Sequence, residues 1–156
     1  MPINSPMTKQ CEGLSAKLRQ LWAQLSHNPG HSSGDPRRKI GARAESAAVR
    51  YLKRQGYHIL ERNLRTRLGE IDIVATDGNW LVVVEVRSRR EDSPVSPRET
   101  LTRNKRRKLR ALTEQLRKRH RLVNKPVRVD LVEVALDERG RVKSCEVLRG
   151  LALGER

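Results

Sequence analysis

Apolar positions repeat at helical spacing first and at strand spacing afterwards. One helical face ends before Gly56, a residue typical of helix C-termini, and it consists of Ile40, Ala44, Ala47, Ala48, Tyr51 and Leu52. Strands are then predicted over residues 57–64, 70–76 and 80–89, with a tight turn at Asp77-Gly78-Asn79. The apolar run 81–84 is typical of a central strand that is buried on both sides.

The second half of the chain adds one more helix and the remaining strands. A loop with two prolines over residues 93–97 precedes a long helix predicted at 98–122. Residues 126–135 form the next predicted strand, and 142–148 could pair back on it as an edge strand. The order helix-strand-strand-strand-helix-strand, with or without that extra edge strand, predicts an α/β domain with a central mixed sheet.

Residues 1–36 form an N-terminal extension to a domain predicted at 37–156. The extension has a helical stripe formed by Leu14, Leu18, Leu21, Trp22 and Leu25. The sequence Asn28-Pro29-Gly30 stops that short amphipathic helix, and a linker runs to Pro36. A poorly packed tail is the simpler interpretation, and a helix that docks on a partner is the alternative.

Charge points to the class of partner. The formal net charge is +16, from 34 Lys and Arg against 18 Asp and Glu, and nearly all of it lies after residue 36. Such an excess favours a polyanion, either nucleic acid or an anionic membrane surface. No apolar run is long enough to span a membrane, and no signal peptide is evident, so a cytoplasmic location is expected. Cys11 and Cys145 have no spacing that suggests a disulfide framework or a zinc site.

Several charged residues stand where the pattern calls for apolar ones. Strand alternation puts Glu70 and Asp72 on one face, with Ile71 and Ile73 on the other, and puts Glu85 and Arg87 together on the next strand. Glu85 interrupts an otherwise apolar run, where a lone carboxylate is costly unless it is paired or binds a metal. A buried salt bridge and a functional site are both open interpretations.

Two helices bring further charges to this face. Glu45 borders the apolar stripe of the first helix, and Lys105 falls inside the stripe of the second, which is Leu101, Lys105, Leu109, Leu112 and Leu116. An inward lysine requires an acidic partner, which Asp72, Glu85 or Glu45 would supply. Clustered carboxylates suit Mg²⁺ or Mn²⁺, which can activate water and neutralise charge on a phosphate.

These residues resemble the PD-(D/E)XK nuclease superfamily, which has the restriction-endonuclease-like fold. The pattern is an acid on one strand, here Asp72, and Glu-x-Lys on the next, here Glu85-Val86-Arg87. A closer resemblance is to the YraN family of uncharacterised bacterial proteins, predicted endonucleases similar to archaeal Holliday junction resolvases. The matching segments, within about residues 41–134, are GARAESAAVRYLKRQGYHILERNLRTRLGEIDIVATDG, LVVVEVRSRR and VRVDLVEV.

The resemblance implies that Glu45, Asp72 and Glu85 are metal ligands, with Glu70 as a neighbouring support residue. Arg87 occupies the usual lysine position, and it stays protonated, so it cannot act as a general base. It can hold the scissile phosphate and stabilise charge in the transition state. Lys105 could assist from the helix, which completes the predicted catalytic set of Asp72, Glu85, Arg87 and Lys105.

The long helix is unusually basic. Residues 103–121 hold ten Lys and Arg against one acid, Glu114. Like charges at this spacing destabilise a helix unless a ligand such as phosphate offsets them. The residues predicted to contact nucleic acid are Arg65, Arg67, Arg103, Arg106, Arg107, Lys108 and Arg110. The shortage of aromatic residues, 3% of the chain, favours contact with the backbone of duplex or branched DNA over stacking on single strands.

Three functional hypotheses remain open. The first is a Mg²⁺-dependent, structure-selective deoxyribonuclease. The second is an inactive nucleic-acid-binding module, and the third is a basic protein associated with RNA or the ribosome. A membrane-surface role is disfavoured because the basic helix has few large apolar residues. A homodimer would support junction resolution, which needs two paired cuts.

Overall fold

Two helices and five strands make up the described part of the chain. The structure is a computed structural model that describes residue 16, residues 36–95, residue 99, residues 101–119 and residues 126–153. The helix expected within residues 1–36 therefore lies outside the described residues, apart from residue 16. The elements are α2 Pro36–Arg54, β1 His58–Thr66, β2 Gly69–Asp77, β3 Trp80–Arg90, α4 Arg103–Arg119, β4 Val127–Leu136 and β5 Val142–Leu148.

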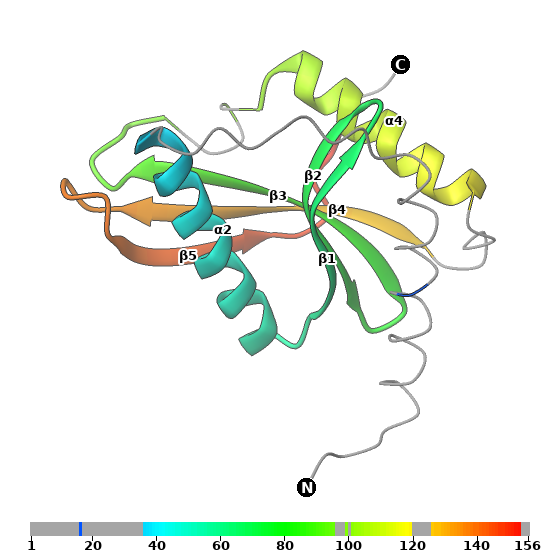
Figure 1. Cartoon of the computed structure of the whole chain (residues 1–156), viewed down its shortest axis with the longest axis horizontal. Helices are drawn as coiled ribbons and strands as arrows, with labels where there is room; N and C mark the ends of the chain where they lie inside the picture. Colours follow the sequence, from blue (N-terminus) through cyan, green and yellow to red (C-terminus); the bar gives the residue numbers. More distant parts are fainter. Residues whose placement is uncertain (1–15, 17–35, 96–98, 100, 120–125, 154–156) are drawn as a thin grey trace, which may run out of the picture.

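The strands form one mixed sheet in which spatial order follows chain order, β1-β2-β3-β4-β5 (Figure 1). Neighbouring strands are antiparallel except β3 and β4, which run parallel and are joined through α4. The predicted α/β class and mixed sheet are confirmed. The order differs from the predicted one by its fifth strand, because residues 142–148 do pair with β4.

The helices cover opposite faces of the sheet. Alternate residues of β3 pack into two clusters: Val82 and Val84 join α2, whereas Leu81 and Val83 join α4. We call these clusters the α2-side core and the α4-side core. All four β3 residues are fully buried, which confirms the central strand predicted from the apolar run. Neither described helix is both long and apolar enough to cross a membrane.

Helix ends account for the main differences in element bounds. At the end of α2, Gly56 has φ +90°, and Tyr57 N–H donates to Leu52 O at 3.0 Å, a glycine-terminated helix end as expected. At the start of α4, the Thr102 hydroxyl accepts the Lys105 N–H at 3.2 Å. This N-cap makes α4 begin at Arg103, five residues later than predicted.

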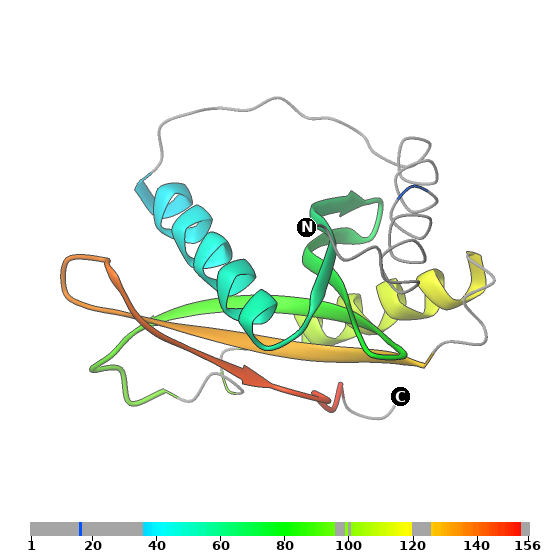
Figure 2. The same cartoon turned by 90° about the horizontal axis from the view of Figure 1, so that it is seen from below.

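Alternation along β2 is not kept, contrary to the prediction that Ile71 and Ile73 share a face. Ile73 packs in the α2-side core, but Ile71 packs in the α4-side core. The physical reason is that β2 is paired with β3 only as far as Ile73 and continues beside β1 alone. Two-stranded ribbons twist more strongly than sheets, and Figure 2 shows this hairpin curling out of the sheet.

Candidate functional site

The candidate site lies at a fork in the sheet. The β2–β3 ladder ends at the Ile73–Val84 pair, and β3 continues beside β4 as far as Arg90. Asp72 and Glu85 are the next residues of the two strands beyond that pair. Asp72 Oδ2 accepts the Val86 N–H at 2.7 Å. The Asp72 side chain therefore replaces a backbone partner at the point where β2 has turned away.

Glu85 is the buried acid of this fork, with 2% of its surface exposed. Lys105 Nζ lies 2.9 Å from Glu85 Oε2, and Arg87 Nη2 lies 3.2 Å from Oε1. The predicted inward lysine thus has its acidic partner, and that partner is Glu85. Oε2 is nevertheless left without a well-aligned hydrogen bond among the described residues, because the Lys105 contact is within ion-pair distance only.

Burial and mutual repulsion disfavour the ionised form of both strand acids. Burial raises the pKa of Glu85 to about 7, and the Asp72 charge adds to this while Lys105 and Arg87 oppose it. Burial likewise raises the pKa of Asp72, against the Val86 N–H and the Lys105 charge. Two neighbouring acids with raised pKa values are typical of a site that accepts a proton or a cation.

Glu45 reaches the same region from α2. Its carboxyl is half-buried, and its pKa is raised first by that burial and then by the negative charge of Asp72. A hydrogen bond from the Asn63 side chain lowers it. Asn63 was not predicted, although its φ of 49° is a conformation that asparagine adopts more readily than most residues. The negative charge of Asp72 therefore acts on both Glu45 and Glu85.

A divalent ion fits the strand pair better than the full predicted trio. Within the described ranges, no three His, Cys, Asp or Glu groups converge closely enough to enclose an ion. Mg²⁺, however, is commonly held by one or two carboxylates together with water and substrate phosphate. Asp72 and Glu85 would provide such a pair, with Glu85 Oε2 exchanging its 2.9 Å contact with Lys105 for the ion. Glu45 as a third ligand stays a prediction.

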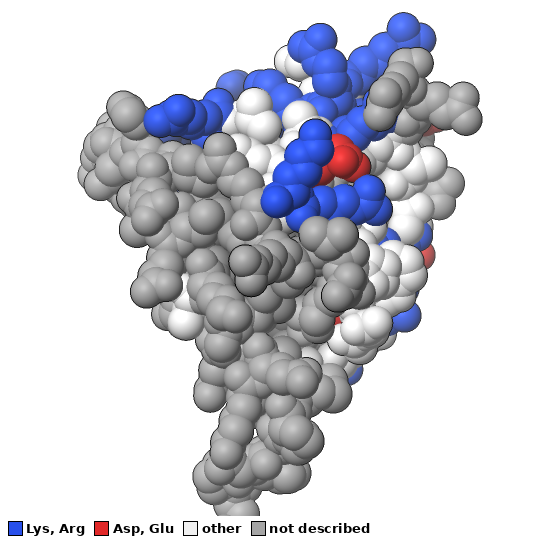
Figure 3. All heavy atoms as spheres, turned by 90° about the vertical axis from the view of Figure 1, so that its right-hand side faces the viewer, with Lys and Arg blue, Asp and Glu red and all other residues white. Residues whose placement is uncertain are grey.

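The predicted nucleic-acid contacts divide into two groups. Arg67, Arg103, Arg107 and Lys108 are exposed. The β1–β2 turn meets α4 here, since a Cβ at Gly69 would lie 3.9 Å from Lys108 Cδ. Arg65 lies beside this turn, 3.7 Å from Glu70. Figure 3 shows basic side chains gathered along the upper part of one face, where α4 lies in Figure 1.

The second group of predicted contacts holds the end of the described chain. Arg106 Nη1 donates to Ala152 O and Arg110 Nη2 donates to Leu153 O, each at 2.7 Å. Both side chains are half-buried. The charge pattern of α4 could not separate these two arginines from its exposed ones, because their partners are backbone carbonyls far away in sequence.

Two further polar clusters lie outside the predicted site. Arg89 forms an ion pair with Glu133 beyond Arg87 on the α4 side of the sheet. On the other side, fully buried Asp130 accepts hydrogen bonds from Tyr57, from Arg128 and from Gly150 N–H at 2.8–2.9 Å. Asp130 is thus fully paired and is a structural link. Arg89 Nε and Glu133 Oε1, by contrast, are buried without a well-aligned hydrogen bond among the described residues.

Known proteins match a region of this chain that runs from α2 to β4 and includes the candidate site. The sequence profile described as "Uncharacterised protein family UPF0102" matches residues 44–134. A UPF0102 protein of Caldicellulosiruptor saccharolyticus is 38% identical over 113 residues, 72% of this chain and 96% of that protein. Another, from Moorella thermoacetica, is 42% identical over 114 residues, which are 73% and 95% of the two chains. One from Kineococcus radiotolerans is 46% identical over 102 residues, or 65% and 84%.

Proposed function

This chain belongs to the uncharacterised protein family UPF0102, also called YraN, and we propose that it is a divalent-metal-dependent endonuclease that acts on duplex or branched DNA. The observation that carries the proposal is the Asp72–Glu85 pair at the β2–β3 fork. Two acids with raised pKa values stand there beside Lys105 and Arg87. The mixed sheet with one helix on each face supports a restriction-endonuclease-like fold.

Metal chemistry at this pair would supply what phosphodiester hydrolysis needs. A Mg²⁺ or Mn²⁺ ion bound by Asp72 and Glu85 would lower the pKa of a coordinated water and offset charge on the phosphate. Glu45, across from Asp72, is the third acid that this proposal assigns to the ion. Hydrogen bonding to Val86 N–H holds Asp72 in place before any ion binds.

The two cations have separate roles in this proposal. The Arg87 side chain is 36% exposed and can reach a phosphate from its place beside Glu85. It cannot take a proton from water, so it binds the scissile group and stabilises its charge. Lys105, whose side chain is 26% exposed, forms an ion pair with Glu85, so its ammonium lies beside the same carboxylate that Arg87 contacts. Its role is to orient the phosphate or the water.

A catalytically inactive nucleic-acid-binding module is the second candidate. The observation that favours it is the pair of contacts to Glu85, from Lys105 and Arg87, which leave that carboxylate already neutralised. This candidate keeps the basic surface formed by α4 and the β1–β2 turn. It predicts nucleic-acid binding that persists in EDTA and no cleavage of any substrate.

Cleavage and binding assays on the same variants separate these candidates. Three substrates, namely linear DNA, branched DNA and structured RNA, are each incubated with Mg²⁺, with Mn²⁺ or with EDTA. We expect Asp72→Asn and Glu85→Gln each to abolish metal-dependent cleavage while binding in EDTA persists. The matched control is Glu146→Gln, which removes an exposed carboxylate from β5. Cleavage that survives both site variants would exclude this site, and preference for RNA would redirect the substrate assignment.

A further inference from the structure

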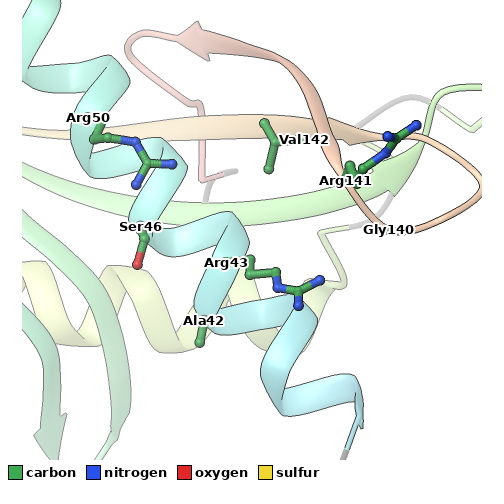
Figure 4. Close-up of a pocket in the computed structure, with 7 residues that line it drawn as sticks. All are labelled: Ala42, Arg43, Ser46, Arg50, Gly140, Arg141 and Val142. Carbon is green, nitrogen blue, oxygen red and sulfur yellow. The ribbon is translucent and has the colours of Figure 1, made fainter.

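A second basic surface lies on the α2 side of the molecule, apart from α4. A groove of about 620 Å³ runs between α2 and the β4–β5 turn. Arg43, Ser46 and Arg50 line one wall, and Gly140 and Arg141 line the other (Figure 4). None of the described residues that line this groove is acidic.

The α2 wall presents regularly spaced cations. Arg43, Ser46 and Arg50 are separated by three and four positions, so they share one helix face. In Figure 4 both arginine side chains extend from α2 toward the side where Gly140, Arg141 and Val142 lie. Arg43 and Arg50 are exposed, and neither forms an ion pair with a described residue. Their charges are therefore available to an anion.

The opposite wall is held in a fixed shape. Asp137 Oδ1 accepts the backbone N–H groups of Arg139 and Arg141, and Asp137 Oδ2 accepts Arg141 Nε at 2.7 Å. Gly140 has φ +72°, and a Cβ there would lie 3.9 Å from Ile40 of α2. The turn therefore lies close to the first part of α2.

Side-chain contacts along α2 link the groove to the candidate site. Arg62 of β1 donates to Ser46 Oγ at 3.3 Å, and the Arg62 charge also acts on Glu45. Glu45 in turn is the α2 residue that faces Asp72 electrostatically. These contacts therefore connect Ser46 of the groove, through Arg62, with Glu45 and Asp72.

We propose that this groove binds the phosphodiester backbone of the nucleic acid whose scissile phosphate lies at Asp72 and Glu85. This inference rests on the proposed function and adds a substrate contact that is separate from α4. Arg43 and Arg50 are two helical turns apart, about 10 Å along the axis. That length corresponds to about three steps of one DNA strand at about 3.4 Å each. The two guanidinium groups would thus contact different phosphates of one strand.

The test is the salt dependence of DNA binding by the full chain in EDTA. The double variant Arg43→Ala/Arg50→Ala is compared with Lys53→Ala/Arg54→Ala, which removes two exposed charges from the same helix outside the groove. Loss of two phosphate contacts should reduce the slope of log K against log salt by about 1.8. At physiological salt we expect affinity for a random-sequence 30-base-pair duplex to fall by at least about tenfold.

The control variant should keep most of the wild-type slope and affinity. Equal behaviour of the two double variants would overturn the groove assignment while leaving the proposed function intact. A wild-type chain that binds no nucleic acid would overturn both. As a second measurement, bound duplex should protect Arg43 and Arg50 from phenylglyoxal but leave Arg54 reactive, and equal reactivity at all three would contradict the proposal.

Discussion

Lys105 of α4 and Glu85 of β3 form an ion pair of 2.9 Å between the helix and the sheet, at the level of the β2–β3 fork. The Glu85 side chain is 3% exposed and that of Lys105 is 26% exposed. This pair links the crossover helix to the one carboxylate whose burial the apolar pattern of β3 made conspicuous. It is both a structural contact and part of the proposed site. Its contribution to folding stability can be measured separately from its contribution to cleavage.

We expect Lys105→Met to destabilise the metal-free chain by about 2–3 kcal/mol, because it leaves a buried carboxylate with only Arg87 as counter-charge. Adding Glu85→Gln to that variant should recover part of the loss, since no buried negative charge then remains. Urea unfolding of the wild type, the two single variants and the double variant, in EDTA, gives the coupling free energy between Lys105 and Glu85. A coupling near zero would show that the ion pair contributes nothing to folding.

Asp72 should show a difference between its two simplest substitutions. Asp72→Ala leaves the Val86 N–H without its acceptor and should lower the free energy of unfolding by about 1–3 kcal/mol. Asp72→Asn keeps an oxygen at that position and should lower it less. Both should abolish metal-dependent cleavage, because both remove the charge. Equal stability of the two variants would mean that the Val86 contact is unimportant.

Tyr57 carries the clearest pH signature outside the site. Burial and the hydrogen bond to Asp130 raise the pKa of the Tyr57 phenol to about 12 from its usual 10. A raised pKa means that the folded chain holds this proton more tightly than the unfolded one. The resulting stability is complete below pH 10 and is lost as the pH rises through 12.

Absorbance at 295 nm, recorded during alkaline titration of the folded and the urea-unfolded chain, measures this shift. Tyr57→Phe should remove the late transition from the folded titration. A Tyr57 transition near pH 10 in the folded chain would argue against its hydrogen bond to Asp130.

Single substitutions on α4 should distinguish cations that contact phosphate from those that hydrogen-bond to the C-terminal backbone. Arg103→Ala and Arg107→Ala should each lower the salt slope of duplex binding by about 0.9, the value for one phosphate contact. Arg110→Ala should change the slope less, because that guanidinium already donates to Leu153 O. It should instead raise hydrogen exchange in residues 150–153. The opposite assignment would appear as a full slope change for Arg110→Ala with unchanged exchange.

Local patterns predicted most elements and the charged face of β3. Period-two spacing placed Glu85 with Arg87, and helical spacing placed Lys105 inward, so their contact followed from sequence. The same rule failed for Ile71, because alternation holds only while a strand stays within a sheet, and β2 leaves β3 at Ile73. No local pattern reports where two strands part.

Partners distant in sequence were also beyond prediction. Arg106 and Arg110 looked equivalent to the exposed cations of α4, but they bind carbonyls more than forty positions away. Asn63 was similarly hidden, since its contact with Glu45 joins β1 to α2. The charge of Asp72 acts on both Glu45 and Glu85, but the assignment of these acids as metal ligands stays a prediction. The geometry of an ion site depends on backbone placement that spacing does not determine.

The topology has a consequence for how the chain folds. Because strand order equals chain order, β1-β2-β3 and β4-β5 can each form from local hairpins, and α4 alone connects them across the parallel β3–β4 pair. That connecting helix is also densely positive, so repulsion opposes this non-local step. A polyanion present during refolding should therefore accelerate assembly of the sheet.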